Sequence, residues 1–339
     1  MTQYAEMTLR PYDILCSICA LGDDQSEALN EKFATLISRI RRNPDIPIAL
    51  RCNVGGAFSY QDIGTESDTP EGSEFNVRRD LEVLHKLNLP PGCVLPARII
   101  FTRAFDGIES VEGICGYATA TSEAWEGCPR ADTGCYEKGR AKGIEALIPP
   151  RDEDEMKREK EKSLETMYDA DAISIRPHIL LCAVCQYGSG VRPPYAPDNL
   201  PELMQLILDK PATLIKVASH ADWMMCAPCP DRVPETNACV TNKGSGGLPN
   251  QMRDLRVLQK LGMTYGDTIE ARELYKRIFE RIPGTFEICA LDHCDPSIWY
   301  TSCGIQTSES ENYDKGRRML MENMEIEPSE NKEINPDSP

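Results

Sequence analysis

Two parts of the chain repeat each other, and this repetition limits the possible folds more than any other feature of the sequence. The segment LRPYDILCSIC, from Leu9 to Cys19, matches IRPHILLCAVC, from Ile175 to Cys185, at an offset of 166 residues (175 − 9). A second pair, RRDLEVLHKLNLPPG from Arg78 and MRDLRVLQKLGMTYG from Met252, is identical at 8 of 15 positions and has an offset of 174 (252 − 78). Because the same elements recur in the same order, the sequence predicts an internal duplication.

Length and charge pattern divide the chain around this duplication. A chain of 339 residues suits two domains of ordinary size. We expect a divergent first copy over residues 1–148, a charged linker over 149–172, a cysteine-rich second copy over 173–306 and an acidic disordered tail over 307–339. The linker has almost no apolar periodicity and is expected to be solvated, with or without a helical part; the tail is acidic and is expected to be disordered.

Apolar spacing in both copies predicts helices that alternate with short strands. The expected elements are helices over 29–40 and 200–207, strands Ile46–Leu50 and Thr213–Val217, helices with Leu81, Leu84 and Leu87 or Leu255, Leu258 and Leu261 on one face, and a helix over 268–282 with a weaker counterpart over 96–105. Asp267 and Glu270 look like the capping box of that last helix. The fold class is therefore α+β: two tandem homologous small domains of helices and short sheets, with metal-thiolate sites at loops and helix ends.

Composition bears on location and partners. The chain has a net charge of −17 and no cluster of Lys and Arg, so it lacks the surface that nucleic-acid binding requires. It has no apolar run long enough to span a membrane, and residues 1–10 show no secretory signal, so we expect a cytoplasmic protein that does not enter a membrane. In a reducing compartment its 15 cysteines are more typical of metal ligands or catalytic groups than of disulfides.

The second copy carries the strongest chemical signal, two CxxC pairs separated by a long segment. Both thiolates of a CxxC reach the same ion, and two such pairs complete a tetrahedral site. We predict metal ligands at Cys182, Cys185, Cys226, Cys229, Cys239, Cys289, Cys294 and Cys303. Eight thiolates make either two four-ligand sites or one cluster with spare cysteines. Thiolates suit zinc, copper(I) or an iron–sulfur cluster; the alternatives to metal binding are buried structural cysteines and a redox-active dithiol.

The same motifs resemble those of an uncharacterised family, the domain of unknown function 1284. RPHILLC, from Arg176 to Cys182, is similar to its RPHHLLC opening, CAPCP from Cys226 to its CxxCP motif, and DLRVL from Asp254 to its DxxVL helix. The late cysteines resemble its C-terminal group. The resemblance covers about residues 175–304 and implies iron–sulfur binding. Cys185 and the first copy depart from the family pattern.

The first copy keeps fewer cysteines. We predict ligands at Cys16, Cys19, Cys115, Cys128 and Cys135, with Cys16, Cys19 and two of the other three around one metal. The alternative is that this copy has lost the metal and kept the fold. Cys52 matches Cys226 by one alignment and Ser219 by the strand-based alignment that we prefer, and Cys93 has no cysteine counterpart.

Histidines and polar loops give weaker signals. His178, close to Cys182, is expected to hydrogen-bond near the metal site without binding the metal, and His293 is an alternative ligand. The Gly-rich stretches over 51–56, 68–72 and 113–117 are either connecting turns or the lining of a ligand pocket between the copies. No phosphate-binding loop is present.

Three functions follow, in this order. The first is a protein that binds one or more iron–sulfur clusters, with an electron-transfer or redox-sensing role and a redox or other protein partner. The second is a zinc-stabilised structural or binding module. The third is a metalloenzyme with an open coordination position and a pocket between the two copies. No residue stands out as a general base, so the sequence leaves open whether the chain is an enzyme.

Overall fold

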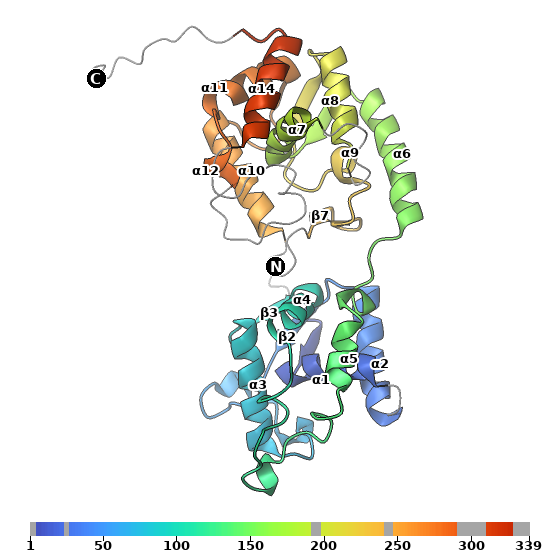
Figure 1. Ribbon diagram of the computed structural model, residues 1–339, viewed down its shortest axis with the longest axis vertical. Helices are drawn as coiled ribbons and strands as arrows, with labels where there is room; N and C mark the ends of the chain where they lie inside the picture. The colour runs from blue at the N-terminus through green and yellow to red at the C-terminus, as the bar shows by residue number, and fades with distance from the viewer. Residues whose placement is uncertain (1–4, 24–26, 191–197, 241–246, 290–309, 328–339) are drawn as a thin grey trace, which may run out of the picture. The chain divides into compact units, whose positions relative to one another are not determined.

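The chain forms two compact units, Met1–Pro150 and Arg151–Pro339, here called unit 1 and unit 2 (Figure 1). The computed structural model describes residues 5–23, 27–190, 198–240, 247–289 and 310–327. Both units combine helices with small mixed sheets, so the predicted α+β class is confirmed. Across the described residues, no helix is long and apolar enough to cross a membrane.

Unit 1 is built on a three-stranded sheet ordered β1–β2–β3. The central strand β2 runs parallel to β1 and antiparallel to β3, and all four of its residues (PIAL) are buried. The elements in chain order are β1 (Met7–Leu9), α1 (Pro11–Gly22), α2 (Glu27–Arg42), β2 (Pro47–Leu50), α3 (Ser73–Leu87), β3 (Val94–Pro96), α4 (Ala97–Gly107) and α5 (Cys135–Ala141), with short 3-10 turns in the connections. The apolar faces of α1 to α4 pack with this sheet into one core.

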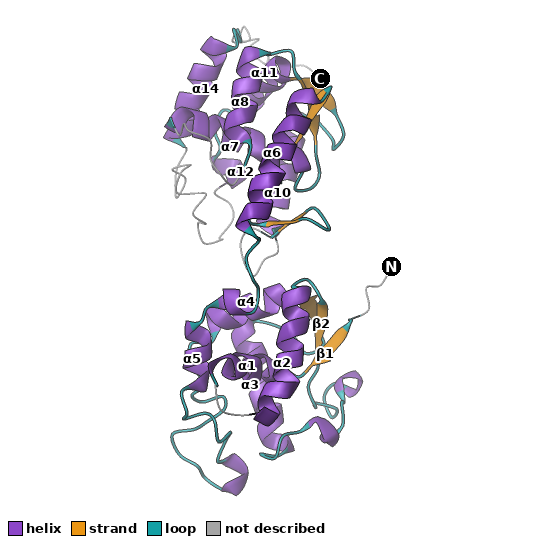
Figure 2. Cartoon of the chain, turned by 90° about the vertical axis from the view of Figure 1, so that its right-hand side faces the viewer, coloured by secondary structure: helices purple, strands orange, loops and turns teal. Residues whose placement is uncertain are grey.

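Unit 2 has a sheet of the same design, ordered β4–β5–β8, with β4 parallel and β8 antiparallel to the central β5 (Figure 2 shows the strands in orange). Its elements are α6 (Glu153–Asp169), β4 (Ala172–Ile175), α7 (Pro177–Ser189), α8 (Leu200–Asp209), β5 (Leu214–Val217), α9 (Trp223–Cys226), β6 (Arg232–Val233), β7 (Ala238–Cys239), α10 (Leu248–Leu261), β8 (Thr268–Glu270), α11 (Ala271–Arg281), α12 (Phe286–Cys289) and α14 (Glu311–Asn323). Helices α7, α8, α10, α11 and α14 enclose its core with the sheet.

The helix that follows the first strand of each unit, α1 or α7, begins at the proline of an Arg-Pro pair. Pro11 and Pro177 occupy the first turn, where proline has no N–H to leave unpaired and already has the helical φ. Arg10 and Arg176 before them are extended. Each arginine is buried and ion-paired, so the start of the helix is fixed by a charged contact as well as by the proline.

A pair of glycines lets two helices touch in each unit. In unit 1, α1 crosses α5 where Gly22 meets Gly139, and a Cβ on Gly139 would lie 1.8 Å from a backbone carbonyl oxygen of α1. In unit 2, α7 crosses α14, which lies beside it in Figure 1, where Gly188 meets Gly316. A Cβ on Gly316 would lie 2.0 Å from a carbonyl oxygen of α7. Backbone atoms cannot turn aside as a side chain can, so only glycine fits these positions.

Gly316→Ala is expected to destabilise unit 2 by about 1–3 kcal/mol, because the added methyl group forces two packed helices apart. Urea unfolding followed by circular dichroism measures the change. Gly56→Ala is the control, since a Cβ at Gly56 would meet no atom within 4 Å. If the two variants unfold at the same urea concentration, the close helix crossing does not contribute as described.

The last predicted helix starts later than expected. Residues 268–270 form strand β8, and α11 begins at Ala271. Pairing of β8 with β5 supplies backbone hydrogen-bond partners along a neighbouring strand, which outweighs the local capping pattern of Asp267 and Glu270. In unit 1 the matching strand β3 likewise precedes α4.

The apolar face of α3 and α10 is also displaced from the predicted one. Leu81 and Leu255 are 41 % and 56 % exposed, whereas Val83 and Val257 are fully buried. The buried residues of α3 are spaced i, i+3, i+4 and i+7, starting at Asp80, and therefore include a charged residue that the apolar pattern left out.

The predicted linker and the predicted tail both contain helices that pack. In the tail, predicted to be disordered from residue 307, α14 buries Tyr313, Gly316 and Leu320 against α7 and the core. In the predicted linker, α6 begins at Asp152, whose carboxylate accepts the N–H of Glu155. Most residues of α6 and α14 are charged or polar, but each helix has a few residues that are buried on one side. Tertiary packing of that side stabilises each helix.

Candidate functional site

Five cysteines of unit 1 converge from separate segments of the chain. Cys16 and Cys19 lie about one turn apart on α1, and Cys135 begins α5, whose close crossing with α1 brings the two helices together. Cys115 and Cys128 lie in the segment between α4 and α5, where the N–H of Cys128 donates to the carbonyl oxygen of Cys115 at 2.7 Å. These five residues are called the unit 1 cysteine cluster.

The thiols of this cluster are close enough to act on one another. Burial raises the pKa of Cys19, and the thiols of Cys115, Cys128 and Cys135 raise it further. Burial also raises the pKa of Cys115 to about 11, against the attraction of a neighbouring arginine. None of the five takes part in a disulfide. A metal that binds here must therefore displace thiol protons.

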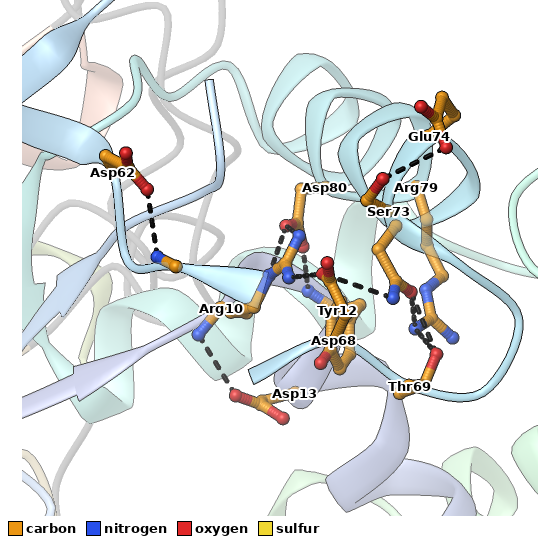
Figure 3. A network of polar contacts seen from close by, with 12 residues as sticks. Arg10, Tyr12, Asp13, Asp62, Asp68, Thr69, Ser73, Glu74, Arg79 and Asp80 are labelled. Carbon is orange, nitrogen blue, oxygen red and sulfur yellow. Dashed lines mark hydrogen bonds and ion pairs between the residues drawn. The ribbon is translucent and has the colours of Figure 1, made fainter. Parts of the chain in front are cut away.

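Figure 3 shows a network of charged and polar side chains around Arg10 and Asp80, which includes Arg79. Arg10 Nη2 lies 2.7 Å from Asp80 Oδ2, and Arg10 also pairs with Asp68. Asp80 accepts the N–H of Tyr12 at 2.9 Å, which joins α3 to the start of α1. Arg79, the neighbour of Asp80 on α3, has no ion pair with a carboxylate among the described residues, and the titratable side chains that most affect its pKa are Cys16, Cys115 and Cys128 of the cysteine cluster.

Three predicted ligands of unit 2 lie on and beside a small hairpin. Cys226 ends α9, the N–H of Cys229 donates to its carbonyl oxygen at 3.0 Å, and Cys239 on β7 faces β6. Arg151 donates to the carbonyl oxygen of Cys229 at 2.7 Å, so the segment before α6 fixes this turn. Burial, Asp231 and Cys239 raise the pKa of Cys229 to about 12, and burial raises that of Cys226 well above its ordinary value. The three are called the unit 2 cysteine cluster.

The remaining predicted ligands of unit 2 lie on other elements or outside the described residues. Cys182 and Cys185 are on α7, where Cys185 is buried with its Sγ 3.9 Å from Ser310 Oγ. Cys289 ends α12. Cys294, Cys303 and His293 lie outside the described residues. The structure thus groups three of the eight predicted ligands of this unit.

The thiols of the two cysteine clusters are suitable metal ligands, but they are not arranged as a metal site. In the described ranges, no three His, Cys, Asp or Glu side chains form a group that could hold a metal ion as they stand. Binding therefore requires thiols to turn toward a common point. The donors themselves fit zinc or an iron–sulfur cluster, since each cluster offers several soft thiols. The buried Nε of Arg79 also suits a negatively charged metal-thiolate group, because it is a donor with no hydrogen-bond partner among the described residues and lies beside these thiols.

His178 is held by a carboxylate. Its Nδ1 lies 2.6 Å from Asp254 Oδ1, and its backbone N–H donates to the same oxygen at 3.0 Å. Arg176 donates to the other oxygen, Oδ2, at 2.6 and 2.8 Å. The three residues fasten the start of α7 to α10, as Arg10, Tyr12 and Asp80 fasten α1 to α3.

Acidification is expected to destabilise unit 2 in two steps. Burial lowers the pKa of His178 below 6.5 although Asp254 attracts its proton, so the unfolded chain takes up that proton first and stability falls below about pH 6.5. Burial alone would raise the pKa of Asp254, but His178 and Arg176 together hold it below 3.8, so a second loss follows below about pH 3.8. One proton limits each slope to about 1.4 kcal/mol per pH unit.

The His178→Tyr variant isolates the first step, because unit 1 has Tyr12 at the matching position and tyrosine takes up no proton between pH 8 and 5. Urea unfolding midpoints over this range should vary less with pH in the variant than in the wild type. An equal pH dependence would show that His178 is not the group responsible.

Three polar residues at the clusters, one buried and two half-buried, were missed by the sequence reasoning. Arg79 lies beside the unit 1 cysteine cluster, Glu71 acts on Cys115 and has a buried oxygen without a hydrogen-bond partner, and Asp198 acts on Cys226. Burial raises the pKa of Asp198 to about 7. One signal was available: the pattern Asn-x-x-Arg-Asp occurs at residues 76–80 and again at 250–254.

The Gly-rich stretches of unit 1 have different fates. The loop over 53–57 lines an open hollow of about 980 Å³ together with Asp62 and the outer face of α3. The stretch over 68–72 instead contains Asp68, which forms an ion pair with Arg10. The stretch over 113–117 contains Cys115 of the unit 1 cysteine cluster. All the lining residues of this hollow belong to unit 1, and a pocket between the two copies stays a prediction.

Comparisons with family models, with curated proteins and with solved structures find no match to this chain. The resemblance to the domain of unknown function 1284 family remains a prediction that rests on the quoted motifs.

Proposed function

We propose that this chain is a metal-thiolate protein that binds iron–sulfur clusters and serves in electron transfer or redox sensing with a protein partner. The observation that carries the proposal is the unit 1 cysteine cluster, in which free thiols from α1, α5 and the segment between α4 and α5 meet in one place. Buried structural cysteines have no need to gather in this way. A bound cluster would supply a one-electron couple that these side chains alone lack.

Each unit contributes its own set of ligands in this proposal. In unit 1, Cys16 and Cys19 with two of Cys115, Cys128 and Cys135 would hold the group. In unit 2, Cys226, Cys229 and Cys239 would supply three ligands and a cysteine of α7 or of the late group the fourth. The CxxCP turn at Cys226 supports an iron–sulfur cluster, since a proline after a ligating cysteine also occurs in ferredoxin-type motifs.

We also propose that the two units arose by internal duplication. The proposal is supported by the repeated sequence segments, by the same strand order and pairing in both sheets, and by the glycine crossings of α1 with α5 and of α7 with α14. The last helices share a third repeat, Tyr136-Glu-Lys-Gly-Arg and Tyr313-Asp-Lys-Gly-Arg. The hydroxyl group of each tyrosine donates to a backbone carbonyl at the end of the preceding long helix, at 2.7 and 2.8 Å.

A zinc-stabilised module is the second candidate, and the hairpin of unit 2 favours it. Strands β6 and β7 have two residues each, and none of these four residues belongs to the apolar core that the described part of unit 2 forms. Such a small ribbon typically depends on a metal for its stability.

Anaerobic purification with a visible spectrum and analysis of iron, sulfide and zinc separates these candidates. Brown protein containing iron and sulfide is the result that the first proposal predicts. Colourless protein with bound zinc would support the second candidate, and protein without either metal would contradict both.

A further inference from the structure

Arg79 is a buried positive charge that forms no ion pair with any carboxylate in the part of the chain that the structure describes. Its side chain is 1 % exposed, and its Nη2 donates to Asn76 Oδ1 at 2.5 Å and to Thr69 Oγ1 at 3.4 Å, both neutral groups. The guanidinium group lies over the ring of Tyr12, 3.9 Å from its centroid, and 4.9 Å from that of Phe75. A buried charge that has only neutral partners is costly for a protein to keep.

Two nearby carboxylates, Asp80 and Asp68, are engaged by Arg10, and the third, Glu71, acts on Cys115 and forms no ion pair with Arg79 among the described residues. Asp80 receives Arg10 and the N–H of Tyr12, and Asp68 receives Arg10 as well (Figure 3). Arg79 has a smaller effect on the pKa of Asp80 than Arg10 and the N–H of Tyr12 have. The groups that act most strongly on the guanidinium are Cys16, Cys115 and Cys128, all members of the unit 1 cysteine cluster.

Neutral thiols do not balance this charge, but a metal-thiolate group does. Four thiolates around one divalent zinc carry a net charge of 2 − 4 = −2, and an iron–sulfur cluster with four thiolates is also negative. We propose that Arg79 is the charge partner of a metal-thiolate group in unit 1, so that the unit 1 cysteine cluster holds a group with net negative charge. This inference rests on the proposed function. Of the two alternatives for unit 1, metal binding or a fold that has lost its metal, it favours metal binding.

The test compares full-length variants that report on unit 1 alone. The background protein carries Cys226→Ser and Cys229→Ser, which remove two predicted ligands of unit 2. Arg79→Gln and Arg78→Gln are each added to this background and compared. Arg78 is the adjacent arginine on α3 and lies in the open hollow, with its guanidinium over the ring of Tyr117. Proteins are purified anaerobically, their metal content is measured, and metal release to EDTA is followed over time.

Arg79→Gln is expected to release metal roughly tenfold faster than the background protein, because the attraction of a buried positive charge beside the cluster is lost. Arg78→Gln should behave like the background. Equal release by Arg79→Gln and Arg78→Gln would overturn the role of Arg79 while leaving metal binding intact. A background protein that never holds metal, although the chain without these substitutions does, would overturn the inference and limit the proposed function to unit 2.

Asn76→Asp tests the same idea in a chain that keeps Arg79. The new carboxylate takes the place of the amide oxygen that accepts from Arg79 at 2.5 Å, and so competes for its charge without leaving the guanidinium unpaired. Faster metal release is expected here as well, with a native circular dichroism spectrum. If Arg79→Gln proves to be unfolded, Asn76→Asp decides: release at the background rate overturns the proposal.

Discussion

Cys19→Ser is expected to remove the metal of unit 1 and leave that of unit 2 in place. Cys19 lies at the centre of the unit 1 cysteine cluster, since three other thiols of that cluster act on it. A serine hydroxyl group does not lose its proton to zinc or iron as a thiol does, so one ligand is lost. The metal-to-protein ratio of the purified variant should fall by the share that unit 1 binds.

Cys93→Ser is the matched control for this change. Cys93 is a half-buried free thiol of the same unit, and neither its sequence position nor its surroundings place it in the cluster. Its variant should keep all of the metal. Loss of metal in both variants, or in neither, would contradict the assignment of the unit 1 site.

Asp254→Asn is expected to destabilise unit 2 by about 3–5 kcal/mol, the usual cost of leaving one partner of a buried ion pair alone. Asp254 is fully buried, and its two oxygens accept hydrogen bonds from Arg176 and from the backbone and ring of His178. An amide provides one acceptor oxygen and turns two N–H groups toward these donors. Urea unfolding measures the loss.

Glu287→Gln serves as the comparison, because Glu287 pairs with Lys260 at the surface. Its substitution should leave the unfolding midpoint unchanged, since exposed pairs contribute little. A midpoint for Asp254→Asn within error of that of Glu287→Gln would show that the ion pair with Arg176 is not what fastens α7 to α10.

The elements with strong apolar periodicity could be predicted from the sequence. Helix α2 and strands β2 and β5 lie where the spacing of Phe33, Leu36, Ile37 and Ile40 and the runs before Leu50 and Val217 indicate them. The ends of α3 and α10 were also predictable, because Asn88 and Gly262 both adopt the left-handed conformation that ends a helix.

Elements that depend on distant partners could not be read in this way. Strand β8 is stabilised by pairing with β5, and α14 is stabilised by packing against α7, where Gly316 contacts Gly188. In both cases the local composition indicates something else. The repeat around Tyr136 and Tyr313 would have revealed α14, but it is short and lies within an acidic segment.

For the candidate site, the sequence indicated which residues carry the chemistry but not how they are grouped. CxxC spacing singles out Cys226 and Cys229 because it is a local pattern. The joining of Cys19 to Cys135 depends on a helix crossing, and the place of Arg79 depends on which face of α3 is buried. A charged residue on a buried face contradicts the apolar pattern, so no periodicity analysis selects it.

The central claim is that the clustered cysteines hold metal, and alkylation of the anaerobic full-length protein with and without a chelator tests it most directly. Modified cysteines are identified by mass spectrometry. We predict that the thiols of both cysteine clusters are protected in the untreated protein and become reactive as the chelator removes the metal. Protection that the chelator leaves unchanged, with no metal released, would show that these thiols are merely buried and would contradict the account.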